Sequence, residues 1–341
     1  MKLKKTSLAT ALVAALAMGA AGQASASVYA GSRLLVENFD IDITNLAGPA
    51  LTGYTFTTAT AATLNGVTVG DSDTCGTING PACVEVAPTP VLQSTSTLGA
   101  PVRNAGDFSF FGPGVGNTYS GSGAEITETE IIGGGTTSVK QIAETELAGS
   151  GAGNAESSLS STTNFTFDFT IAAGELGDLT LSFNADPDLF VAVNTLGLIP
   201  PAEATARISA SFNLVGNNGT QVSWAPDGVV GAFSAANCEG VTSCAETADS
   251  ESLNITRTLF PGNPSSNGYS DSRFGVDPGM SAFGITITGL REGSYTFTLT
   301  SQALVTAQQR VPEPGTLLLI GGALAALGIG GVRRRRGQQA A

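Results

Sequence analysis

Carboxylates are the most abundant side chains in this sequence that could do chemistry. The chain has 28 Asp and Glu residues, 15 Lys and Arg residues and no histidine. Catalysis that depends on histidine is therefore excluded, as is a zinc site with a histidine ligand. Two carboxylates could hydrolyse a polysaccharide. In a chain with this many carboxylates, however, the presence of two of them does not indicate a catalytic pair. Because the sequence contains no nucleophile elbow, phosphate-binding loop or dinucleotide fingerprint, we expect no enzymatic activity.

Acidic pairs at alternate positions could offer oxygen ligands to calcium. The candidates in loop-like contexts are Asp71 with Asp73 and Asp186 with Asp188. Neither pair belongs to an EF-hand loop or to a glycine-rich calcium nonapeptide. Residues two positions apart on a strand share a face whatever their purpose. A solvated acidic surface is thus the default interpretation, and we expect no cofactor, with calcium as the one candidate.

The four cysteines form two local couples. Cys75 lies close to Cys83, and Cys238 lies close to Cys244. In an exported protein both couples are expected to be disulfides, and closing nearby residues is the simplest of the three pairings. A metal site built from all four thiolates is the alternative, but the spacings do not suit a zinc ribbon.

The N-terminus has the features of a secretory signal peptide. Three lysines within the first five residues precede an apolar stretch, and Ala24-Ser25-Ala26 follows. Small residues at these positions predict cleavage by signal peptidase between Ala26 and Ser27. We therefore assign residues 1–26 to the signal peptide.

The C-terminus combines three features in order. Pro312-Glu313-Pro314 comes first, the apolar run 316–332 follows, and a basic cluster closes the segment. The cluster consists of Arg333, Arg334, Arg335 and Arg336. An apolar run of this length with a basic end predicts a single membrane helix whose arginines stay on the cytoplasmic side.

Residues 311–336 resemble the PEP-CTERM sorting signal of Gram-negative bacteria in motif, spacing and position, and a polar tail, 337–341, follows them. The resemblance implies recognition by an exosortase, a membrane transpeptidase that cleaves near Pro-Glu-Pro. It also implies an inner-membrane-anchored precursor whose body moves to the cell surface or the extracellular matrix.

The exported body, 27–310, favours strands. Apolar and polar residues alternate in several windows, which places one set of side chains on each face of a strand. These windows are residues 37–44, 164–170, 207–214, 282–288 and 294–300. Turn signals such as Asn65-Gly66 separate the windows and suit hairpins. We expect an antiparallel β-sandwich or jelly-roll-like body, although the pattern does not give the strand order.

Residues 112–161 are rich in glycine and contain a short echo in which Glu128 and Glu130 correspond to Glu144 and Glu146. A hairpin with glutamates along one solvated face is the first interpretation of this segment. A flexible segment is the second.

The charge balance limits the partners. The net charge is −13, and much of the positive charge lies at the two ends. Such a body repels nucleic acid and anionic membranes. We expect an exported surface or matrix protein associated with biofilm or exopolysaccharide, with exosortase and signal peptidase as processing enzymes and a transient contact with the inner membrane. A calcium-dependent carbohydrate-binding or adhesive β-sandwich is the alternative, and a carboxylate-based hydrolase is the third.

Overall fold

The computed structural model describes residues 27–45, 51–75, 92–93, 106–114, 118–127, 137–148, 155–194, 202–231, 237–260 and 279–309. Within these ranges the protein is all-β and antiparallel and contains no helix, which confirms the predicted fold class. The strands are β1 (Ser27–Thr44), β2 (Leu51–Leu64), β3 (Val67–Cys75), β4 (Leu92–Gln93), β5 (Tyr119–Thr127), β6 (Thr137–Ala148), β7 (Ala155–Asn194), β8 (Glu203–Gly216), β9 (Gln221–Trp224), β10 (Cys238–Glu239), β11 (Ser243–Asp249), β12 (Ile255–Leu259) and β13 (Ser281–Gln309).

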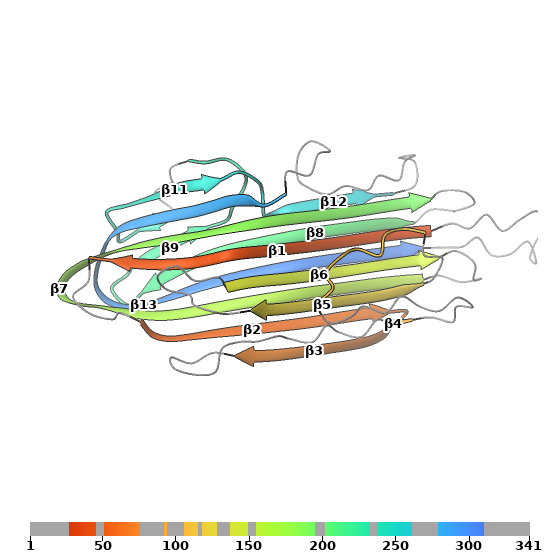
Figure 1. The fold of residues 1–341 in the computed structure, drawn as a ribbon, viewed down its shortest axis with the longest axis horizontal. Coiled ribbons are helices and arrows are strands. Elements are labelled where there is room, and N and C mark those ends of the chain that lie inside the picture. Colours follow the sequence, from red (N-terminus) through yellow and green to blue (C-terminus); the bar gives the residue numbers. More distant parts are fainter. Residues whose placement is uncertain are drawn as a thin grey trace, which may run out of the picture.

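Two long strands, β7 and β13, build the architecture because each passes through both layers of a sandwich. The first half of β7 pairs with β2 and with the second half of β13, and the second half of β7 pairs with β1 and with the first half of β13. Figure 1 shows both strands turning at the same end of the molecule. Gly174, Gly289 and Gly293 have positive φ at these bends, a conformation that glycine adopts without steric cost.

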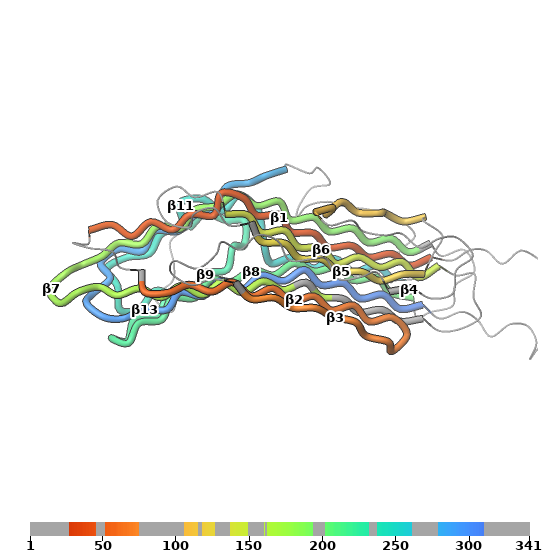
Figure 2. Tube along the Cα trace, turned by 60° about the horizontal axis from the view of Figure 1, so that its bottom comes forward, coloured from red at the N-terminus to blue at the C-terminus, as the bar shows by residue number. Residues whose placement is uncertain are grey.

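The bends divide the continuous sheet into two facing layers (Figure 2). One layer has the order β3-β2-β7-β13-β8. On the other side of β8, β12 pairs with its first half and β9 with its second half, and β10 pairs with β9. The other layer has the order β4-β5-β6-β1-β7-β13-β11. This arrangement is the sandwich that the alternating windows predicted.

The half of the core nearest the bends is aromatic. Phe165, Phe167 and Phe169 of β7 are buried on one face, as the alternation in residues 164–170 predicted. Ring centroids are 4.5 Å apart between Phe56 and Phe165 and 4.7 Å apart between Phe212 and Trp224. Offset contacts of this kind stabilise a core beyond the area that the rings bury.

The other half of the core is packed with small residues, and the two layers approach closely there. The Ser32 hydroxyl of β1 donates a 2.8 Å hydrogen bond to the carbonyl oxygen of Arg207 in β8, in the opposite layer. Ser122 of β5 donates a 3.3 Å bond to the carbonyl of Ala61 in β2. A hydroxyl on one layer can reach the backbone of the other only because no large side chain separates them.

Both ends of the described body lie at one end of the sandwich. The first residue of β1, Ser27, pairs with Asn194 at the end of β7, and the last residue of β13, Gln309, pairs with Ala155 at the start of β7. Since β7 folds back on itself, its two ends lie at the same end of the molecule, away from its bend (Figure 1). We call this end the terminal pole and the opposite end, around Gly174, the bend pole. At about 3.4 Å per residue, residues 293–309 extend about 55 Å between them.

Candidate functional site

The sorting segment continues directly from a central strand of the body. Residues 293–309 of β13 pair with β7 on one side, and most of them pair with β8 on the other. Gln309, the last described residue, is buried. The sorting residues Pro312, Glu313 and Pro314 therefore begin three positions after a strand that is held on both sides.

Several sequence predictions fall outside the described residues. They include the signal peptide with Ala26, the Pro-Glu-Pro motif, and Arg333, Arg334, Arg335 and Arg336. Ser27, the predicted mature start, is the first residue of β1. The described part of the chain contains no helix long and apolar enough to cross a membrane.

Asp186 and Asp188 lie on strand β7, not in a loop as their sequence context suggested. They share one face, and both pair with the guanidinium of Arg33 on β1, with an Nη2–Oδ2 distance of 3.4 Å to Asp186. Asp188 is 2% exposed and Asp186 is 8% exposed. The arginine offsets part of the negative charge that a calcium ion would otherwise balance. Within the described ranges, no group of three or more Cys, Asp or Glu residues is arranged to hold a metal ion.

A strap formed by residues 106–114 crosses the outer face of β1 and β6. Glu144 accepts a 2.6 Å hydrogen bond from the Tyr29 hydroxyl and a 2.9 Å bond from the amide of Gly112. Glu146 accepts a 2.9 Å bond from the amide of Gly114. Both glutamates are buried. Strands β5 and β6 form the expected antiparallel pair, but the expected solvated face is wrong for these two residues because the strap covers them.

Aromatic side chains of the strap lie against the basic residues beneath it. The Arg33 guanidinium carbon is 5.7 Å from the centroid of the Phe110 ring, and the Lys140 ammonium nitrogen is 5.8 Å from that of Phe108. Lys140 also pairs with Glu125 at 2.6 Å. The strap therefore covers two cations, Arg33 and Lys140, each of which pairs with a carboxylate. Arg33 was not among the residues predicted from the sequence, although a single cation in an otherwise apolar stretch is a signal for a buried ion pair.

Asp71 and Asp73 also lie on a strand, β3, although a loop was expected. Both side chains are exposed, and each accepts a hydrogen bond from the amide that follows it. Asp71 Oδ1 is 2.9 Å from the nitrogen of Ser72, and Asp73 Oδ1 is 2.8 Å from the nitrogen of Thr74.

Two further carboxylates, Asp249 and Glu246, hold the loop of residues 225–231. Asp249 of β11 accepts hydrogen bonds from the amides of Asp227 at 2.9 Å and Gly228 at 3.1 Å. Glu246 accepts from Trp224 Nε1 at 2.7 Å and from the Gly231 amide at 2.6 Å. Burial raises the pKa of Asp249 to about 6, while the two amides act in the opposite direction. Alternation along residues 243–249 could have placed these carboxylates on a strand, but not beneath a loop.

The predicted Cys238–Cys244 disulfide is present and joins β10 to β11, with the two Cα atoms 6.2 Å apart. The second predicted disulfide stays a prediction, because Cys83 and the side chain of Cys75 lie outside the described part of the structure.

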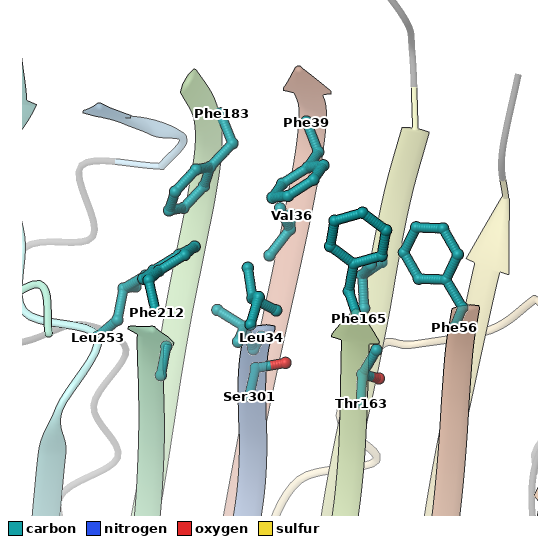
Figure 3. A pocket seen from close by; sticks show the side chains of 13 residues that line it. Leu34, Val36, Phe39, Phe56, Thr163, Phe165, Phe183, Phe212, Leu253 and Ser301 are labelled. Atoms are coloured by element: carbon teal, nitrogen blue, oxygen red, sulfur yellow. The ribbon is translucent and has the colours of Figure 1, made fainter. Parts of the chain in front are cut away.

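A cavity of about 20 Å³ lies between the layers. Figure 3 shows Phe39, Phe165, Phe183 and Phe212 at one side of it and the hydroxyls of Thr163 and Ser301 at the other. A volume of this size accommodates about one water molecule. It is too small to hold a sugar ring.

The comparisons with known proteins concern the C-terminus. The family model for the PEP-CTERM protein-sorting motif matches residues 310–336. No curated protein and no solved structure matches the chain. The motif indicates an exported protein that is anchored as a membrane precursor and sorted by an exosortase. Residues 310–336 thus carry a PEP-CTERM protein-sorting motif.

Proposed function

We propose that this protein is a non-enzymatic component of the cell surface or of the exopolysaccharide matrix, to which an exosortase delivers it. In this proposal the sorting segment holds the sandwich at the inner membrane until cleavage near Pro312-Glu313-Pro314. The sandwich then reaches the outside as a folded unit.

One observation carries the proposal, namely that β1 begins and β13 ends at the terminal pole. A membrane segment attached before β1 or after β13 would therefore leave the sandwich at the terminal pole. The bend pole is then held about 55 Å from the membrane, given a strand rise of about 3.4 Å per residue. A long body tethered at one end suits display better than it suits binding within the membrane.

The attachment of the tail supports the same proposal. The tail follows a strand with hydrogen-bonded neighbours on both sides, so cleavage after Gln309 leaves every pair of the sheet in place. The body would thus keep its fold through processing.

Mass spectrometry of the C-terminus tests the sorting step. Surface-located protein is expected to lack the tail in cells that contain an exosortase and to keep it in cells that do not. Glu313→Gln is expected to retain the tail, whereas Glu239→Gln, the same change at an exposed strand residue, is expected to be processed normally. A peptide containing Arg333 from the wild-type surface protein would contradict the proposal.

Fluorescence quenching tests the orientation of the precursor. Val67, near the terminal pole, is 62% exposed, and Leu176, at the bend pole, is 59% exposed. With the precursor reconstituted in vesicles that carry a headgroup quencher, a dye on Val67→Cys should be quenched more strongly than a dye on Leu176→Cys. Equal quenching would contradict an upright body.

Assays with calcium and with polysaccharide distinguish this function from the two alternatives. A rise in melting temperature with calcium that a chelator reverses would support an adhesive or carbohydrate-binding module. Hydrolysis of a polysaccharide that is lost on replacing one carboxylate would support an enzyme. The proposal expects neither result.

A further inference from the structure

Within the described ranges, strand β3 pairs with β2 alone and therefore forms an open edge of the sandwich. An open edge presents unpaired backbone groups to which the strand of another chain can bind. A protein that accumulates at a surface or in a matrix, as in the proposed function, reaches a high local concentration, at which such strand pairing between copies becomes more favourable.

The hairpin that joins β2 and β3 determines which backbone groups of β3 face outward. Its two central residues, Asn65 and Gly66, have φ of 51° and 80°, as in a two-residue type I′ turn. Leu64 and Val67 flank this turn as a hydrogen-bonded pair, and alternate pairs beyond it repeat the pattern. The amides of Ser72 and Thr74 therefore point away from β2.

The side chains of Asp71 and Asp73 accept hydrogen bonds from these two outward amides. Each carboxylate accepts the N–H of the next residue, at 2.9 Å for Ser72 and 2.8 Å for Thr74. An incoming strand would have to break both hydrogen bonds before it could pair here.

The same carboxylates lie on the inner face of the edge strand. Asp71 pairs with Thr60 and Asp73 pairs with Thr58, and both threonines are buried between the layers. Residues paired across a sheet share a face. A strand added at β3 would extend the layer and take two charged side chains out of water, which is costly.

We propose that Asp71 and Asp73 prevent a second copy of this chain from pairing with β3. A symmetric pair of β3 strands would also bring the aspartates of one copy close to those of the other, and like charges on neighbouring strands repel. The partner that the two residues exclude is thus the same edge of another molecule.

Replacing both residues with threonine tests the proposal, because threonine is neutral and favours strands. The full-length chain is purified in detergent, and its dimerisation is measured by sedimentation equilibrium. Asp71→Thr with Asp73→Thr is expected to tighten dimerisation at least about tenfold. The matched control is Glu37→Thr with Glu175→Thr, which removes two charges away from β3 and should leave dimerisation as in the wild type.

A third substitution tests whether the new dimer uses the β3 edge. Proline at position 72 removes an outward amide without removing a bond to β2, and edge strands tolerate proline at such positions. Adding Ser72→Pro to the threonine pair is expected to restore the monomer. The proposal fails if the threonine variant, folded by circular dichroism, dimerises no more than the control, or if Ser72→Pro leaves the dimer unchanged. If the threonine variant does not fold, Asp71→Asn with Asp73→Asn must tighten dimerisation instead, because it removes the charges at constant size.

Discussion

The Tyr295 hydroxyl donates a 2.5 Å hydrogen bond to the carbonyl oxygen of Arg291, four residues earlier in β13. The bond spans the bend at which β13 leaves one layer and enters the other. The same hydroxyl accepts a 2.7 Å bond from Asn218 Nδ2, and the Tyr295 ring stacks on Phe169 with centroids 5.0 Å apart. Tyr295 thus ties together three segments at the bend pole, in the way that a tyrosine corner secures other sandwiches.

Tyr295→Phe is expected to lower the free energy of unfolding by about 1 kcal/mol, because it removes the partner of the Arg291 carbonyl and one of the two acceptors of Asn218 Nδ2. Urea unfolding measures the change. Asn218→Ala, alone and combined with Tyr295→Phe, completes a double-mutant cycle. Strictly additive effects would show that the two side chains do not act as a pair.

The strap over β1 depends on a glycine beneath it. A Cβ atom on Gly31 would lie 2.8 Å from Phe110 Cε1 and 2.8 Å from the Tyr29 hydroxyl oxygen. Gly31→Ala should therefore displace the Phe110 ring, destabilise the fold by about 1–3 kcal/mol and increase hydrogen exchange in residues 106–114. Gly53→Ala is the matched control, since its nearest contact would be an ordinary 3.9 Å to Asp168. Similar exchange in both variants would contradict the role of Gly31.

The strands could be predicted because one face of each is buried. In residues 294–300, for example, Tyr295, Phe297 and Leu299 are buried, as their alternation indicated. The fold class followed from such windows. The bends in β7 and β13 did not, because a glycine between two apolar windows fits a hairpin as well as a strand that changes layers. The order of the strands depends on those bends.

The candidate sites show a similar limit. Asp186 and Asp188 were expected in a loop or on a solvated acidic surface, but both are buried on β7. Their partner Arg33 is more than 150 positions away, and only the pairing of β1 with β7 brings it close. The burial of Glu144 and Glu146 depends on the strap, which precedes them by about thirty residues. Sequence patterns report which face a residue occupies, and not what covers that face.

The raised pKa of Asp249 makes stability depend on pH. Its pKa rises from 3.8 to about 6 on folding, so the native state holds the proton more tightly than the unfolded state does. The contribution of this group is therefore fully present below about pH 4 and is lost as the pH rises through about 6. Asp249→Asn does not titrate at this position and serves as the reference. Relative to this variant, the free energy of unfolding of the wild type should decrease as the pH rises from about 4 to about 6. A difference independent of pH would contradict the raised pKa.

The Cys238–Cys244 disulfide should stabilise the fold by about 2.5 kcal/mol, because it closes a short loop in the unfolded chain. Replacing both cysteines with serine is expected to lower the midpoint of urea unfolding accordingly. Reductant applied to this serine variant then isolates the second predicted disulfide, since Cys75 and Cys83 are the only other cysteines in the chain. A further loss of stability, together with a linked Cys75–Cys83 peptide in a non-reducing digest, is the expected result. Free thiols at both positions in protein taken from the cell surface would show that the second pair does not form.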